Sequence, residues 1–245
     1  MFHLMKPAVL RSAVRNTIHW LRLPDASQYA PEASRPIFRP YRAGAFRAIY
    51  AAIAPYTLVS PDRAHIIYSC ARQALRIQGD FIECGVYRGG TAMLLKHVLG
   101  EAGERRKRLL LFDSFEGMPE NDAQGDSYRP GEMSDTTYED VAKRVLDGDQ
   151  VEVFKGFIPG TFDAVRNHEF AFAHVDVDIY QSIKDCCEFI YPRLNPGGWI
   201  VFDDYGFPSC AGGRRAIDEF FAGRPENPIV LPTGQALVVK LPDVP

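Results

Sequence analysis

The sequence predicts an α/β fold with a mostly parallel central sheet and helices on both of its faces. Short apolar runs typical of strands alternate with longer helical stretches from about residue 60 onward. Three of these runs end on an acid, at Asp113, Asp176 and Asp203. Because open α/β sheets bind ligands outside the carboxyl ends of their strands, we expect these acids to converge on one rim.

Each predicted element has its own local signal. The first helix begins with Ser60 as its cap and Pro61 at its first position, and the second opens at Gly89. A third helix is predicted from Thr136, because Thr136 and Glu139 have the spacing of a capping box. Further helices are expected over 180–191 and 214–221, and strands over 81–85, 109–113, 151–154, 171–176, 199–203 and 236–240.

Charge divides the 245-residue chain into two parts. Residues 1–47 hold eight Lys or Arg against two acids and carry +6, whereas the rest carries −9, for a total of −3. We expect residues 1–55 to be a basic helical arm that contacts a second subunit of a homo-oligomer, or alternatively an anionic membrane surface. Residues 56–245 are expected to form a single domain.

Several classes of protein are excluded by composition. No apolar run is long enough to span a bilayer, and no nucleic-acid motif accompanies the net negative charge. The five cysteines form neither a CxxC pair nor a zinc-ligand spacing, which favours free thiols in a reducing compartment. Without a secretory leader pattern, the expected location is the cytoplasm.

A glycine-rich turn follows the first predicted strand. In residues 83–90 the glycines fall at Gly85, Gly89 and Gly90, where a backbone turns tightly and approaches a ligand, although the run is not GxGxxG. Asp113 ends the next strand and is placed to accept hydrogen bonds from ribose hydroxyls. Together they favour an adenosine-type cofactor; a tight βα turn and a cap for the turn at Ser114 are the alternatives.

The acids at the later strand ends indicate a metal. Adjacent carboxylates such as Asp203 and Asp204 repel each other unless a cation or a basic residue lies between them. With Asp176 from the neighbouring strand they form an oxygen-rich set that suits Mg²⁺. The alternative is a salt bridge to Arg214 or Arg215.

Two polar residues next to Asp176 receive structural interpretations. Asp178 lies three residues before Gln181, which favours a helix cap over a ligand. His174 lies deeper in the strand, where a satisfied core or rim histidine is expected. The long loop over 114–135 is predicted to cover the acceptor, and its acids are predicted to be mostly solvated.

Four motifs, at residues 81–90, 113–119, 174–180 and 203–206, resemble the macrocin O-methyltransferase family, and the resemblance extends over about residues 56–240. It implies a Rossmann-like class I methyltransferase fold and enzymes that use S-adenosylmethionine and Mg²⁺ to methylate sugar hydroxyls. The chain departs from the family pattern at residues 155–162, which border the cofactor side of the cleft.

The resemblance also implies a set of site residues. The metal ligands are Asp176, Asp203 and Asp204, and Asp176 also serves as the base. The cofactor residues, drawn from the glycine turn and the strand ends, are Glu83, Gly85, Tyr87, Gly89, Thr91, Asp113, Ser114, Gly156, Phe157 and Asp176.

The expected function is a metal-dependent O-methyltransferase acting on a small-molecule glycosyl acceptor. Coordination of the acceptor hydroxyl to Mg²⁺ lowers its pKa and fixes its oxygen opposite the methyl carbon. A catechol or phenol O-methyltransferase shares this logic. An NAD-dependent sugar oxidoreductase, which would normally show GxGxxG and Tyr-x-x-x-Lys, and a non-catalytic cofactor-binding protein are further alternatives.

Overall fold

The computed structural model describes residues 39–42, 44–103, 106–120, 126–146 and 150–242. Most of the predicted arm lies outside these ranges, so its contact with a second subunit or a membrane stays a prediction. Its last residues form η2 (Pro40–Arg42), α2 (Gly44–Ile53) and η3 (Ala54–Tyr56). Phe46 and Ile53 of α2 are buried in the same hydrophobic cluster as α3 and α4, so this helix belongs to the core of the domain.

Seven strands form one sheet in the order β3-β2-β1-β4-β5-β7-β6. The five strands β1 to β5 pair in parallel, while β7 is antiparallel to both β5 and β6. Their bounds are β1 (Asp80–Cys84), β2 (Leu109–Asp113), β3 (Val151–Lys155), β4 (Phe170–Val175), β5 (Leu194–Phe202), β6 (Ile229–Val230) and β7 (Ala236–Val239). The predicted mostly parallel α/β sheet is confirmed.

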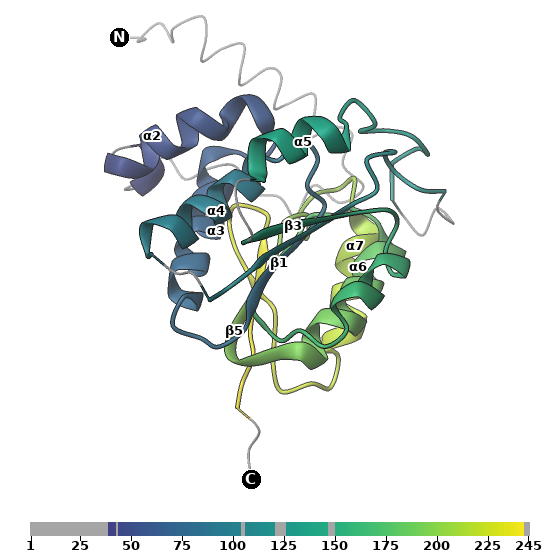
Figure 1. Cartoon of the computed structure of the whole chain (residues 1–245). Coiled ribbons are helices and arrows are strands. Elements are labelled where there is room, and N and C mark those ends of the chain that lie inside the picture. The colour runs from purple at the N-terminus through teal and green to yellow at the C-terminus, as the bar shows by residue number, and fades with distance from the viewer. Residues whose placement is uncertain (1–38, 43, 104–105, 121–125, 147–149, 243–245) are drawn as a thin grey trace, which may run out of the picture. The chain divides into compact units, whose positions relative to one another are not determined.

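Helices cover both faces of the sheet (Figure 1). One face packs against α2, α3 (Pro61–Ala74), α4 (Gly90–Glu101) and α5 (Tyr138–Val145). The other packs against α6 (Tyr180–Ile190), α7 (Ala211–Phe221) and the 3₁₀ turns η4 (Gly160–Val165) and η5 (Tyr191–Arg193). Because both faces are covered, the central strands are apolar throughout, and all six residues of β4 are buried.

The strand order reverses beside β1, which has β2 on one side and β4 on the other. A crevice forms at such a point because the connections leave in opposite directions. Gly85 has a φ of 85° here, and a Cβ at this position would lie 1.8 Å from the carbonyl oxygen of Asp176. Only glycine fits, so the loops after β1 and β4 are in direct backbone contact.

Two predicted helix starts, those of α5 and α7, differ from the structure. Thr137, not Thr136, caps α5 by accepting from the N–H of Asp140, and Thr136 donates to the carbonyl of Tyr87 instead. Helix α7 begins at Ala211, three residues before its predicted start. Helix α6 begins at Tyr180 as predicted, but its N-cap residue is Ile179, so Asp178 is not the cap that its spacing predicted. Among the described residues, no helix is long and apolar enough to cross a membrane.

Candidate active site

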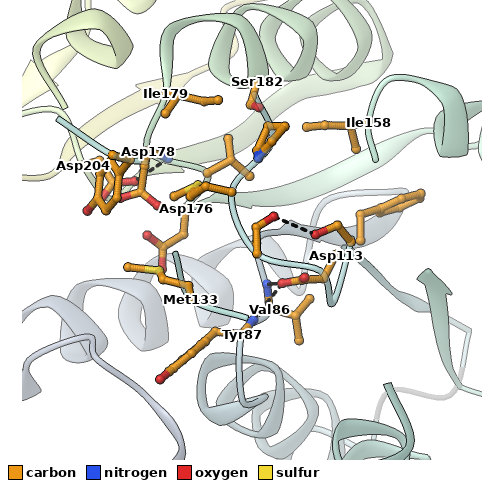
Figure 2. A pocket seen from close by; sticks show the side chains of 18 of the residues that line it. Val86, Tyr87, Asp113, Met133, Ile158, Asp176, Asp178, Ile179, Ser182 and Asp204 are labelled. Atoms are coloured by element: carbon orange, nitrogen blue, oxygen red, sulfur yellow. Dashed lines mark hydrogen bonds between the residues drawn. The ribbon is translucent and has the colours of Figure 1, made fainter. Parts of the chain in front are cut away.

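A cavity of about 520 Å³ opens at the carboxyl ends of the parallel strands. Its walls come from the loops after β1 to β5, from the segment before α3, and from Tyr128 and Met133 of the long loop. Figure 2 shows Asp113 with Val86 and Tyr87 on one side, Asp178 with Asp204 on another, and Asp176 between them. The cavity therefore joins the two groups of residues that the sequence singled out.

Seven predicted cofactor residues besides Asp176 line this cavity: Gly85, Tyr87, Thr91, Asp113, Ser114, Gly156 and Phe157. Within this group, Asp113 also organises the turn between β1 and α4. Its Oδ2 accepts from the N–H groups of Val86 and Tyr87, both at 2.8 Å, and its Oδ1 accepts from Phe115 N–H at 2.7 Å. One carboxylate thus fixes the glycine turn, caps its own turn, and still faces the cavity.

The other two predicted cofactor residues do not line the cavity. Glu83 is fully buried in β1, where its Oε1 lies 2.8 Å from Nδ1 of His174 on the neighbouring strand. Gly89 precedes α4 with a φ of 86° and lies against Val141 of α5. Glu83 and Gly89 therefore support the residues that line the cavity without lining it themselves.

Asp203 is buried behind the cavity and already has partners. Its Oδ1 accepts from Nε2 of Gln235 at 2.7 Å and lies 3.7 Å from Nε2 of His174. Its Oδ2 is ion-paired with the guanidinium of Arg63 from α3. The basic partner of this strand end is therefore Arg63, and the alternative that assigned Arg214 or Arg215 is wrong.

The buried histidine beside Asp203 is held in its charged form. Burial lowers the pKa of His174, but its contacts with Asp203 and Glu83 outweigh that effect and raise the pKa to about 10. Burial alone would raise the pKa of Asp203, but His174 and Arg63 lower it. The positive charges of His174 and Arg63 are thus paired with Asp203 and Glu83.

The negative charges of the remaining carboxylates at the cavity, Asp176 and Asp204, are poorly balanced by nearby positive charge. Burial, followed by the negative charge of Asp203, raises the pKa of Asp176 to about 7. Burial and the charges of Asp178 and Asp176 raise the pKa of Asp204 well above its usual value. This crowding of negative charge would be relieved by a cation between the side chains.

Asp178 belongs to this cluster, although its spacing favoured a cap. It has a φ of 60°, and its side chain is buried against Tyr128 and Cys210 with hydrogen bonds to both. Its backbone N–H donates to Oδ2 of Asp204 at 3.2 Å. The left-handed backbone turns the carboxylate toward Asp204, which a pattern of residue types does not encode.

The donor set fits a hard divalent cation. Ligand atoms of His174, Asp176 and Asp203 lie within 4.8 Å of one another, as do those of Asp178, Asp204 and Cys210. The three predicted ligands are thus divided between two adjacent groups. Asp176 and Asp204 face the cavity with carboxylate oxygens, the donors that Mg²⁺ prefers, while Asp203 lies behind them in its ion pair.

Comparison with known proteins decides the family. Residues 48–230 match the family described as Macrocin-O-methyltransferase (TylF). The chain belongs to the macrocin O-methyltransferase family. It is an S-adenosylmethionine-dependent O-methyltransferase, as the four motifs predicted, and not an NAD-dependent oxidoreductase.

Two named O-methyltransferases match about two thirds of the chain. An 8-demethyl-8-(2,3-dimethoxy-alpha-L-rhamnosyl)-tetracenomycin-C 4'-O-methyltransferase of Streptomyces olivaceus is 31% identical over 181 residues, which cover 67% of each chain. The mycinamicin III 3''-O-methyltransferase of Micromonospora griseorubida is 29% identical over 67% of this chain and 70% of its own.

Solved structures support the class I methyltransferase fold. The O-methyltransferase NovP superposes with a TM-score of 0.68 at 24% identity, over 76% of this chain and 83% of its own. An O-methyltransferase from Bacillus cereus in complex with SAH gives a TM-score of 0.52 at 18% identity, over 87% and 96% of the two chains.

Sequence reasoning missed three residues at this site, Arg63, Tyr128 and Gln235, and interpreted a fourth, Asp178, as a helix cap. Arg63 and Gln235 reach Asp203 from α3 and from the segment before β7, and no local pattern marks them. For Asp178, the alternation with His174 and Asp176 places the three on one face of an extended strand, whereas the spacing to Gln181 favours a cap.

Proposed function

We propose that this methyltransferase moves a methyl group from S-adenosylmethionine to a hydroxyl of a sugar or glycosylated natural product with the help of Mg²⁺. The observation that carries the proposal is one cavity that holds both the Asp113 turn and the carboxylates of Asp176, Asp178 and Asp204. The relatives support the acceptor class, because one is named for a rhamnosyl-tetracenomycin and another for mycinamicin III.

The cofactor side of the cavity is proposed to lie between the loops after β1, β2 and β3. Asp113 has room to accept from the ribose, since a carboxylate offers about four lone-pair positions and the backbone uses three. Gly85, Tyr87, Thr91 and Ser114 form the adjoining wall, and Gly156 and Phe157 close it from β3. Glu83 and Gly89 act indirectly by holding the turn.

The metal would be held by Asp176 and Asp204, with Asp203 behind them. When bound, Mg²⁺ lowers the pKa of a coordinated hydroxyl and orients its oxygen. Methyl transfer from a sulfonium needs no covalent intermediate, so the chain has to position the acceptor, exclude water and take one proton. We assign the proton to the carboxylate of Asp176, which lies between the cofactor turn and the Asp178–Asp204 side of the cavity.

Three measurements test this proposal together. Turnover of sugar acceptors should fall on addition of EDTA and return with Mg²⁺. Asp176→Asn should lose about 100-fold or more in rate, because general-base catalysis contributes about 10²- to 10⁴-fold. Its affinity for S-adenosylhomocysteine in calorimetry should stay near that of the wild type.

Contrary outcomes are equally specific. Full activity in EDTA would contradict the proposed metal requirement. An unchanged rate for Asp176→Asn would contradict the proposed role of Asp176 as the base. Turnover of catechols or phenols in preference to glycosides would replace the acceptor class while keeping the same site.

Assembly and location are also proposed. We propose a cytoplasmic homo-oligomer, because all five cysteines are buried free thiols, as suits a reducing compartment, and symmetric oligomers are common. The mass in solution of a variant lacking residues 1–38, which leaves the buried Phe46 of α2 in place, tests the arm, and an unchanged oligomer would reject its role.

A further inference from the structure

Asp126 holds the beginnings of two helices with one carboxylate. Its Oδ2 accepts from the backbone N–H of Tyr180, the first residue of α6, at 2.8 Å. Its Oδ1 accepts from the N–H groups of Gly212 at 2.8 Å and Gly213 at 3.3 Å, in the first turn of α7. The acids of the long loop were expected to be mostly solvated, and Asp126 is an exception because its carboxylate accepts three backbone hydrogen bonds.

This arrangement matters because of what precedes each helix. Asp178 lies two residues before α6, and Asp204 lies in the connection that leads from β5 into α7. The positive ends of both helix dipoles meet the carboxylate, and it satisfies N–H groups that lack partners within their helices. Asp126 thereby ties together the two segments that carry the cavity acids.

Close packing around Asp126 shows that its position is narrowly defined. A Cβ on Gly212 would lie 2.4 Å from Oδ2 of Asp126, and a Cβ on Gly213 would lie 2.7 Å from the carbonyl oxygen of Asp178. The next residue continues the attachment, since Ser127 N–H donates to the carbonyl of Ser209 at 2.9 Å.

We infer that Asp126 is a positioning residue that keeps Asp204, a proposed metal ligand, at its present spacing from the buried carboxylate of Asp178. It does not line the cavity itself, whereas Tyr128, two residues later, lines it and hydrogen-bonds to Asp178. The inference rests on the proposed metal-dependent function, because metal binding is the property that this spacing serves.

The test compares Asp126→Ala and Asp126→Asn with a matched control, Glu116→Ala, which removes an exposed acid of the same loop that does not line the cavity. Affinity for Mn²⁺ alone is measured by electron paramagnetic resonance, affinity for S-adenosylhomocysteine by calorimetry, and amide exchange at Tyr180, Gly212 and Gly213 by mass spectrometry. All are done well below the melting temperature.

Asp126→Ala should weaken Mn²⁺ binding by about 10- to 100-fold, the usual cost of losing a residue that orients metal ligands. The cofactor affinity should stay unchanged, because its wall comes from other loops. Asp126→Asn should show a smaller loss, since an amide keeps one accepting oxygen, and Glu116→Ala should match the wild type.

Wild-type Mn²⁺ affinity in Asp126→Ala, even with a lower melting temperature, would show a merely structural role and overturn the inference. Equal loss of cofactor and metal affinity would overturn it too. If the wild-type protein binds no Mn²⁺, the metal part of the proposed function fails. The amide exchange data then test separately whether Asp126 holds the first turns of α6 and α7. Faster exchange at the three amides in Asp126→Ala would support it, and unchanged exchange would refute it.

Discussion

Arg63 and Asp203 form an ion pair that joins helix α3 to the end of β5 directly behind the cavity acids. Burial lowers the pKa of Arg63, but Asp203, Asp176 and Asp204 together raise it above its ordinary value. The guanidinium also lies over the ring of Phe207, 4.9 Å from its centroid. It is therefore a fixed positive charge that serves several carboxylates.

Removing this cation should cost stability. Arg63→Met leaves Asp203 with only His174 and Gln235 as partners, and removing one partner of a buried ion pair typically costs about 3–5 kcal/mol. The free energy of unfolding from urea titration measures it. Arg72→Met is the control on the same helix, because its side chain is exposed and its loss should cost less than about 1 kcal/mol. Equal losses for the two variants would contradict the role of Arg63.

Asp113→Asn should weaken cofactor binding. An asparagine has one accepting oxygen where the carboxylate receives three backbone N–H groups, so at least one donor in the turn loses its partner. Asparagine also loses accepting capacity toward the ribose proposed to bind there, and a lost hydrogen bond of this kind costs about 1–3 kcal/mol, or roughly a 5- to 150-fold weaker affinity for S-adenosylhomocysteine in calorimetry. An unchanged affinity would show that the turn is held by other contacts.

Gly85→Ala should disrupt the fold at the strand-order reversal. The new methyl group would collide with the Asp176 carbonyl at a positive φ, so we expect a loss of about 2 kcal/mol or more. Gly100→Ala is the matched control, because nothing lies within 4 Å of its Cβ in α4 and it should gain about 0.5–1 kcal/mol. A tolerated Gly85→Ala would mean that the two loops separate easily.

Glu226 should make stability depend on acid pH. Burial raises its pKa, but hydrogen bonds from Tyr191 and from the N–H of Leu241 outweigh burial and lower it. Its contribution is therefore complete above its unfolded value of about 4.5 and is lost as the pH falls through the lower folded value. Glu226→Gln should reduce the free energy of unfolding by about 1–2 kcal/mol at pH 7, and by progressively less in acid.

The control for this prediction is Glu188→Gln, an exposed acid on α6. Its difference from the wild type should be small at every pH, because exposed pairs contribute little. A difference for Glu226→Gln that does not shrink in acid would show that the carboxylate's charge is not what stabilises the segment.

The fold was predictable because its signals are local. Apolar runs marked the buried strands, and glycines and acids at their ends marked the rim where Asp113 and Asp176 line one cavity. Helix starts were less predictable, since neighbouring residues such as Thr136 and Thr137 offer the same hydroxyl and only the backbone decides between them.

The partners within the site were not predictable from spacing. Asp203 pairs with Arg63 and Gln235, and Asp126 bonds to α6 and α7, across separations of tens of residues. These choices depend on which loops the sheet order brings together. Asp178 shows that a local pattern can also mislead. Its spacing to Gln181 favoured a helix cap, but its backbone has a φ of 60° and its side chain does not cap the helix.

The buried cysteine thiols can report local opening of the protein. Cys70 belongs to the core under α3, Cys84 and Cys186 belong to the opposite core, and Cys210 lies beside Asp178. A thiol reagent can modify each of them only when its surroundings open. Labelling rates followed peptide by peptide would therefore time the opening of the two cores and of the active site separately, without any engineered probe.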